Sequence, residues 1–482
     1  MVYILLTIYF ICLSYLLIFS INQFVLTINY RSREKKGSNS GELPVTLPFV
    51  TIQLPVYNER FVVERLLSAV DRIGYPNDRL EVQILDDSTD ETSQIIREFV
   101  QNKDRTYIHI TRNKRQGYKA GALSHGLSFA KGELIALFDA DFVPKDDFLE
   151  KTLPFFSDPK TGMIQTRWKH LNQNFSILTE LQAFGLDAHF TVEQAGRYSA
   201  GKFINFNGTA GIWRKEAIID AGGWADDTLT EDLDLSYRAQ LKGWKFHYLE
   251  DYDCPSELPV TVDNIKSQQF RWTKGTAETA VKILPEVLRS EISSKKKLSA
   301  FFHLTSSLVF VSVFLASIIS VPLVYFKSIL PELEGIFLAA NAFVLGFLFI
   351  AYFYWVSLQS SKSRVKSYLW RFPMFMSLSM SLGAQNTMAT IEGLIGKRSA
   401  FIRTPKFNIL TSKDRISKNN YLRSRINITN VLEFLMVIYF GGALVMGFLL
   451  DDLGLIIFHG FLLAGYSLIT YFSIKELIYA KA

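Results

Sequence analysis

Two groups of acidic residues in this chain each follow a short apolar segment. The first reads DDSTD at residues 86–90, and the second reads DAD at residues 139–141. Either group taken alone is explained by turn or helix-cap chemistry, which favours Asp and Ser. However, Asp139 and Asp141 stand two residues apart, so at a strand end their carboxylates point into one cavity. The pair is predicted to share Mg²⁺ or Mn²⁺, whose coordination shell phosphate oxygens typically complete.

A nucleotide bound near these acids has to be held without a glycine-rich loop. Neither GxGxxG nor GxxxxGK[ST] follows a predicted strand in this sequence. The basic stretch 112–119, which ends in Lys119, lies between the two acidic groups. We therefore expect phosphates to be held by a metal ion and by basic side chains.

Two later motifs carry further candidate residues. Thr-Glu-Asp at 230–232 opens a helical stretch, where acids are also ordinary first-turn residues. Gln268, Arg271 and Trp272 share one face of a helix, because they are spaced three and four residues apart. Arg can hold a pyrophosphate through two hydrogen bonds, and an indole can stack on a sugar ring. An isolated Trp of this kind is more often a core residue.

Alternating strands and helices are predicted to position these motifs. Short β-rich runs occur at 50–54, 82–85, 108–110 and 134–138, and amphipathic helical stretches at 61–73, 91–101 and 119–130. This order predicts an α/β fold with a mostly parallel sheet and helices on both faces. Ligands of such sheets bind beyond the carboxyl ends of the strands, which is where the acidic groups lie.

Long apolar segments flank the predicted α/β domain. Residues 1–30 contain no charged side chain, and 2–26 is long enough to span a bilayer as a helix. A cleaved signal peptide is the alternative, but it needs a basic start and a shorter apolar run. Further spans are predicted at 301–326, 336–356, 428–450 and 453–474, with Glu433 near enough to a helix end to reach the interface.

The segment 372–395 begins apolar and then includes Gln385, Asn386 and Glu392. The basic segments 31–36, 295–297, 362–371 and 397–425 all lie on one side of the membrane only if it does not cross. We therefore expect an interfacial or re-entrant helix, five spans and an external N-terminus. A sixth crossing, the alternative, leaves one basic loop outside.

Bulk composition fits this two-part chain. The net charge is only +6, and the basic residues cluster beside apolar segments. This pattern indicates a membrane surface rather than nucleic acid as the partner. The two cysteines are too few for a disulfide framework, which favours a reducing compartment for the soluble part.

In their order along the chain, these motifs resemble those of processive family 2 glycosyltransferases, the group of cellulose, chitin, hyaluronan and mannan synthases. The phrase FNGTAGIWR at 206–214 looks most like plant cellulose-synthase-like glucomannan and xyloglucan-backbone synthases and their bacterial relatives. The segment 401–406, FIRTPK, resembles the gating loop of cellulose synthases. Arg403 stands where an apolar residue is usual there.

The resemblance implies a glycosyltransferase A-type nucleotide-sugar-binding domain at 31–297, between an anchor at 1–30 and a membrane domain at 298–482. It implies an integral membrane enzyme whose catalytic domain is cytoplasmic. Such an enzyme polymerises a β-linked hexose with inversion and passes the product across the bilayer. Asp232 is implied as the general base. The other implied roles are donor or nucleotide contacts from Asp87, Lys119, Asp139, Gln268 and Arg271; metal ligation by Asp139 and Asp141; acceptor contacts from Glu231 and Trp272; and donor closure by Phe401, Thr404 and Lys406.

Two other functions and two donors stay open at this point. A single transfer onto a lipid acceptor uses the same kind of soluble domain, whereas QxxRW and the segment 401–406 favour a polymerase. A transporter with a nucleotide-sugar-binding regulatory domain leaves Asp232 without a role. UDP-glucose and GDP-mannose are both plausible donors, with glucan slightly favoured over mannan.

Overall fold

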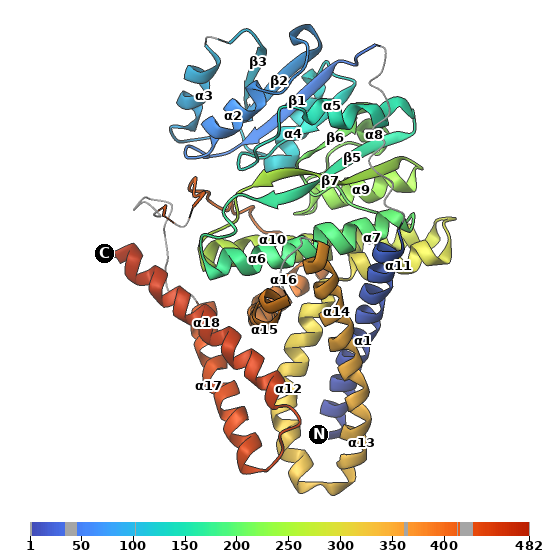
Figure 1. Ribbon diagram of the computed structural model, residues 1–482, viewed down its shortest axis with the longest axis vertical. Coiled ribbons are helices and arrows are strands. Elements are labelled where there is room, and N and C mark those ends of the chain that lie inside the picture. Colours follow the sequence, from blue (N-terminus) through green and yellow to red (C-terminus); the bar gives the residue numbers. More distant parts are fainter. Residues whose placement is uncertain are drawn as a thin grey trace.

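The computed structural model describes residues 2–33, 46–101, 103–360, 365–411, 413–414 and 428–481. This part of the chain has two portions, an α/β domain and a set of long helices that extend from it (Figure 1). Basic residues of the topology argument at 35–36, 362–364 and 415–425 lie outside the described residues.

A seven-stranded sheet, counted over the described residues, forms the centre of the α/β domain. Its strands are β1 Val50–Val56, β2 Leu80–Asp86, β3 Thr106–Thr111, β4 Leu134–Leu137, β5 Thr161–His170, β6 Gly211–Arg214 and β7 Lys245–Ser256. The spatial order is β3-β2-β1-β4-β6-β5-β7, and β6 alone runs antiparallel to both of its neighbours within this sheet. The predicted mostly parallel sheet is confirmed, and the four predicted strands correspond to β1–β4.

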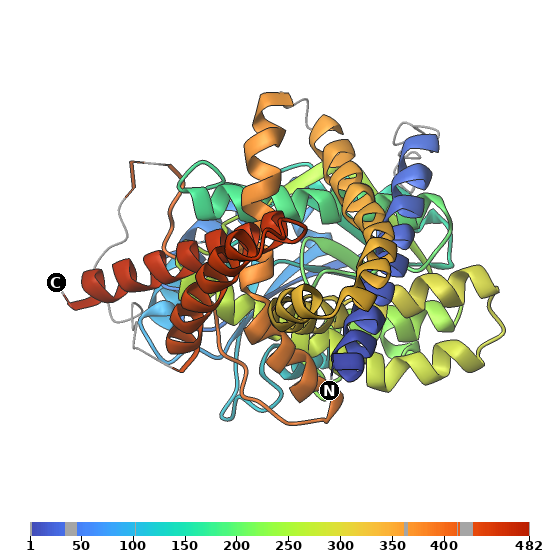
Figure 2. The ribbon, with the colours of Figure 1, turned by 90° about the horizontal axis from the view of Figure 1, so that it is seen from below.

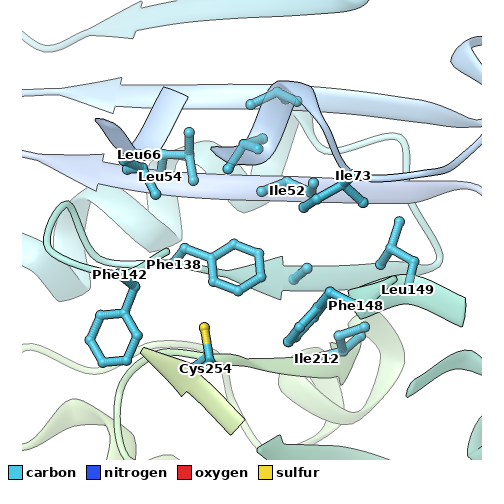
Figure 3. Close-up of a cluster of buried hydrophobic side chains, with 14 of the residues drawn as sticks. Ile52, Leu54, Leu66, Ile73, Phe138, Phe142, Phe148, Leu149, Ile212 and Cys254 are labelled. Atoms are coloured by element: carbon cyan, nitrogen blue, oxygen red, sulfur yellow. The ribbon is translucent and has the colours of Figure 1, made fainter. Parts of the chain in front are cut away.

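Helices cover both faces of the sheet, which is why β1 and β2 are buried along nearly their whole length. The helices of this domain are α2 Val63–Asp71, α3 Thr92–Val100, α4 Tyr118–Phe129, α5 Phe148–Thr152, α6 Ile177–Ala188, α7 Gln194–Ser199, α8 Lys215–Asp220, α9 Glu231–Leu241, α10 Val262–Arg289 and α11 Ser294–Leu304. Ile52 and Leu54 of β1 pack with Leu66 of α2 and with Phe138 in one buried cluster (Figure 3). Leu123 of α4 belongs to a second cluster on the other face.

Helix α10 lies between the sheet and the long helices (Figure 1). The hydroxyl of Thr261 accepts from the backbone N–H of Asn264 and so caps its first turn. Helix α10 also packs closely on α16 Gly383–Leu394. A Cβ on Gly393 would lie only 2.6 Å from the carbonyl oxygen of Lys274, so glycine permits this approach.

Among the described residues, five helical segments are long and apolar enough to cross a membrane. They are α1 Val2–Ser32, α12 Leu308–Ile329, the run Pro331–Ser360 that contains α13 Glu334–Ala340 and α14 Val344–Ser360, α17 Ile428–Leu449, and α18 Ile456–Lys481. They identify the chain as membrane-embedded. Seen from below, α17 and α18 (red) lie on the opposite side of the helical portion from α1 (dark blue) (Figure 2).

Two details of the predicted membrane segments are wrong. The span expected at 301–326 begins later, because α11 ends at Leu304 and α12 starts at Leu308. Glu433 is not exposed at a helix end: its carboxylate is buried and lies 2.6 Å from the ammonium of Lys266 on α10. The segment 372–395 forms the end of α15 Val365–Ser381 and α16, and its interfacial position stays a prediction.

Candidate active site

The carboxyl ends of β2 and β4 carry the two acidic groups, as expected for ligand-binding residues of such a sheet. Beyond β4, Asp139 lies 2.6 Å from the ammonium of Lys119 on α4. The same ammonium donates to the carbonyl oxygen of Gly208 at 2.9 Å, and the backbone N–H of Asp139 donates to Thr209. Lys119 therefore joins the strand-end acid to the loop before β6.

Asp87, beyond β2, is held by a guanidinium. Arg112 donates from Nε to one carboxylate oxygen of Asp87 at 2.9 Å and from Nη2 to the other. Nη1 of Arg112 binds the carbonyl oxygen of Gln116, which shapes the loop before α4. The next guanidinium, Arg115, lies 3.4 Å from the ring centre of Tyr57. These contacts give the predicted nucleotide side of the site a flat cationic and aromatic surface.

The candidate base, Asp232, lies in the first turn of α9 beside Glu231. The backbone N–H of Leu233 donates to Asp232 Oδ1 at 2.8 Å. Gly208 has a φ of +81°, and a Cβ there would lie 3.0 Å from Asp232 Oδ2 and 3.4 Å from Lys119 Nζ. The loop before β6 thus approaches Asp232 and Lys119 together, which its glycine permits.

Burial gives Asp232 the protonation behaviour of a base. Burial, together with the neighbouring Glu231 carboxylate, raises the pKa of Asp232 to about 7. Burial also raises the pKa of Glu231 and that of Asp139 above their ordinary values. A carboxylate whose pKa is near neutral can accept a proton from a hydroxyl more effectively than an ordinary one.

Helix α10 brings the Gln-x-x-Arg-Trp face to this cluster. Gly275 packs against Thr230: a Cβ there would lie 2.5 Å from the methyl group of Thr230. Burial lowers the pKa of Arg271 to about 10, and the nearby carboxylates, Glu231 first, oppose that effect. Gln268 and Trp272 are half-buried on the same helix, so Trp272 is not a fully buried core residue.

The segment 401–406 reaches into the same place from between α16 and α17. Phe401 stacks on Tyr118 with ring centres 5.8 Å apart, and Arg271 lies 4.5 Å from the centre of the Phe401 ring. Arg271 also donates to the hydroxyl of Thr404 at 2.8 Å. Lys406 Nζ lies 2.7 Å from Asp141 Oδ2. The segment 401–406 therefore contacts both Arg271 and Asp141, which lie far from it in the chain. Gln268 and Trp272 stand on the same helix as Arg271.

A divalent cation fits the acids at 139 and 141 only in part. Both carboxylates offer hard oxygen ligands, but Asp139 is paired with Lys119 and Asp141 with Lys406. No group of three His, Cys, Asp or Glu side chains in the described residues forms a complete cation site. An ion at this place therefore needs phosphate oxygens from a substrate, and Lys406 has to leave Asp141.

Sequence reasoning missed two carboxylates at other strand ends. Glu59, three residues after β1, pairs with Arg403. Glu257, directly after β7, is 2% exposed and accepts from the backbone N–H groups of Phe407 and Ile409. The strand-end rule that found Asp87 and Asp139 points to Glu257 as well, once β7 is recognised as a strand.

Known proteins resemble this chain in sequence and in fold. The model of the family described as "Glycosyltransferase like family 2" matches residues 48–275. Glucomannan 4-beta-mannosyltransferase 7 of Arabidopsis thaliana is 42% identical over 269 residues, which cover 53% of this chain and 48% of that protein. Probable glucomannan 4-beta-mannosyltransferase 4 of Oryza sativa subsp. japonica is 41% identical over 297 residues, covering 60% and 53%. The chain spans about half the length of these curated relatives.

A solved structure supports the fold. It is the mannosyltransferase PcManGT from Pyrobaculum calidifontis in complex with GDP-Man and Mn²⁺, matched with a TM-score of 0.57 at 18% identity. The match covers 82% of this chain and all of that one. Together with the mixed sheet, it gives the α/β portion a glycosyltransferase A-type architecture. The comparisons therefore show that residues 48–275 are similar to glycosyltransferase family 2, and that the chain is similar to glucomannan 4-beta-mannosyltransferases over about half of its length.

Proposed function

We propose that this chain is an inverting hexosyltransferase that polymerises a β-linked polysaccharide from a nucleotide sugar. One observation carries the proposal: the candidate base and the donor-side residues meet at one glycine. A Cβ on Gly208 would contact both Asp232 and Lys119, and Lys119 in turn pairs with Asp139. A base placed beside a phosphate-binding lysine suits an attack on the anomeric carbon of a nucleotide sugar.

The proposed reaction uses a single base. Asp232 takes the proton of an acceptor hydroxyl while that oxygen bonds to the anomeric carbon of the donor sugar. The bond from this carbon to the diphosphate breaks, and its electron pair leaves with the nucleoside diphosphate. Lys119 and Arg271 lie where they can stabilise the departing charge. A divalent cation held by Asp139 and Asp141 would supply further positive charge when bound.

GDP-mannose is the preferred donor of this proposal. The chain shares more than 40% identity with relatives named glucomannan 4-beta-mannosyltransferases, over roughly half of their length. This similarity reverses the slight preference for glucan drawn from the motifs. The proposed product is accordingly a β-linked mannan or glucomannan, with UDP-glucose as a second donor to be tested.

Polymer extension is proposed to depend on Trp272, and export on the portion beyond residue 297. Trp272 is half-buried, so its indole can rest beneath the terminal sugar of a growing chain. An aromatic face holds a sugar without fixing its position along the chain axis, which suits a product that has to slide. The helices after α11 are proposed to line the exit path. In this proposal the chain consists of an anchor at 1–30, a catalytic domain at 31–297 and a membrane domain from residue 298 onward.

The catalytic domain is proposed to face the cytoplasm. Both short connections between spanning helices, near residues 330 and 452, lie at the end far from the sheet (Figure 1). The region 327–335 contains one basic residue, Lys327, and the region 451–455 contains none. The end of the long helices that faces the sheet carries more basic residues, so the positive-inside rule assigns that end to the cytoplasm.

A donor panel tests the proposal. Purified protein in lipid nanodiscs is incubated with GDP-mannose, UDP-glucose or UDP-N-acetylglucosamine, and both nucleoside diphosphate release and product length are measured. We expect release from GDP-mannose together with a long product that an endo-β-mannanase digests. A product of one sugar on a lipid contradicts polymerisation, and turnover of no donor contradicts the transferase assignment.

A further inference from the structure

Arg403, the residue that departs from the gating-loop pattern, has a specific partner in the folded chain. It donates from Nε to Glu59 Oε1 at 2.8 Å and from Nη2 to Glu59 Oε2 at 2.6 Å. Only 12% of the Arg403 side chain and 13% of the Glu59 side chain are exposed. The paired geometry fixes the guanidinium plane as well as its position. A charged residue at this place is therefore accommodated by a matching acid 344 residues earlier.

Glu59 belongs to a loop that is itself held firmly. Its neighbour Asn58 has a φ of +56°, and the backbone N–H of Asn58 donates to the hydroxyl of Ser88 at 2.9 Å. The side chain of Asn58 also accepts from the backbone N–H of Thr89 at 2.8 Å. The loop after β1 is thus tied to the loop after β2, so Glu59 is a rigid docking point for Arg403.

The other contacts of the segment 401–406 lie where substrate is proposed to bind. Thr404 contacts Arg271, a proposed donor residue, and Lys406 contacts Asp141, a proposed metal ligand. Both contacts have to change when a metal–diphosphate group enters. Glu59 is neither a proposed donor residue nor a proposed metal ligand, so its pair with Arg403 can persist while Thr404 and Lys406 exchange partners.

Beyond the segment, the chain is held by a second acid that does not depend on Arg403. Glu257 accepts from the N–H groups of Phe407 and Ile409 and from Arg65 at 3.0 Å. The backbone after residue 406 therefore has its own attachment to the end of β7. Within the segment, the attachment is the ion pair between Glu59 and Arg403, which stands three residues before Lys406.

We propose that Glu59 is a positioning residue which, through Arg403, keeps the segment 401–406 over the donor and thereby sets donor affinity. This inference rests on the proposed function. Removing either charge leaves the other largely buried without its partner, so the closed position of the segment loses stability. The chemistry of transfer does not involve either residue. Donor affinity should therefore fall while the rate at saturating donor is retained.

The test uses the purified full chain in nanodiscs and the variants Glu59→Gln, Arg403→Gln and the swap Glu59→Arg with Arg403→Glu. Glu91→Gln is the matched control, because Glu91 pairs with Arg60 next to Glu59 but is 67% exposed. Hydrogen exchange of peptides covering residues 401–406 is measured without donor. The KM for GDP-mannose and kcat are then measured on the same preparations.

We expect exchange at 401–406 to become at least fivefold faster in both single variants and to stay unchanged in Glu91→Gln. The KM should rise about tenfold with kcat within twofold of the parent, and the swap should recover part of both effects. Unchanged exchange at 401–406 in Arg403→Gln overturns the anchor. A lower KM in the single variants overturns its role in donor retention. If the parent turns over no donor, the proposed function fails, whereas the exchange data still decide whether Glu59 anchors the segment.

Discussion

At the scale of single residues, the site is a group of charges brought into mutual contact. Lys119 touches the acid at Asp139 and the backbone at Gly208, and Gly208 lies against Asp232. The short spacing of Asp139 and Asp141 could be recognised from sequence because strand ends converge at one edge of a sheet. The role of Glu59 could not be recognised from sequence, because its partner Arg403 is brought to it only by the folding of the whole chain.

The raised pKa of Asp232 predicts a pH dependence. A base must be deprotonated to act, and burial raises the pKa of Asp232 to about 7. Activity at saturating donor should therefore be low in acid and rise as the pH passes through 7. Well below that value, kcat should fall about tenfold for each pH unit. A pH profile of kcat between 5 and 9 checks this, and a flat profile down to pH 5 contradicts the assignment.

Gly208→Ala should damage the site locally. A Cβ there is 3.0 Å from Asp232 Oδ2, so the base or the loop has to shift, and φ is +81°. We expect kcat to fall about tenfold or more. Gly201→Ala is the matched control, since Gly201 also has a positive φ but nothing within 4 Å of the added Cβ. Both variants incur backbone strain, so equal losses of kcat in the two would remove the argument for a local clash.

At the scale of elements, the strands and the two acidic strand ends were predictable because periodicity and burial agree there. The start of the first span after the catalytic domain was not predictable from the sequence. Hydropathy is high from Phe301 onward, yet the helix breaks at Thr305 and restarts at Leu308, and apolar composition carries no signal of that break. Glu433 was misjudged for a similar reason, because its partner Lys266 lies on a helix of the other portion.

The pair of Lys266 and Glu433 ties α10 to α17, so its loss should separate catalytic and membrane helices. Both side chains are at most 7% exposed. Lys266→Met leaves a buried carboxylate without its partner and should cost about 3 kcal/mol or more of stability. The double variant Lys266→Met with Glu433→Met should recover most of the lost stability. Thermal unfolding in detergent measures both, and a single variant as stable as the parent contradicts the coupling.

At the scale of the whole molecule, the five candidate spans and the α/β domain lie as the proposed topology requires. The connection near residue 330 and the catalytic domain lie at opposite ends of the long helices (Figure 1). This arrangement agrees with the distribution of basic residues, which sequence alone could use only by assuming that 372–395 does not cross. The structure divides that stretch between α15 and α16, neither of which is among the five candidate spans of the described residues.

Cysteine labelling checks the orientation. Ser328 and Thr411 are exposed, and the native Cys12 and Cys254 are buried, which keeps background reaction low. A membrane-impermeant thiol reagent applied to intact cells should label Ser328→Cys and leave Thr411→Cys unlabelled. Inverted vesicles should give the opposite result. Labelling of Thr411→Cys from outside means that the proposed topology is wrong by one crossing.

The central claim is that Asp232 removes the acceptor proton in transfer from a nucleotide sugar. Its most direct test compares the parent with Asp232→Asn, a substitution close in size that cannot act as a carboxylate base. GDP-mannose binding and polymer formation are measured on the same nanodisc preparations. The account predicts donor affinity within a few-fold of the parent and a loss of turnover of about 10²–10⁴-fold. Polymer formation by Asp232→Asn at a near-parental rate would contradict it.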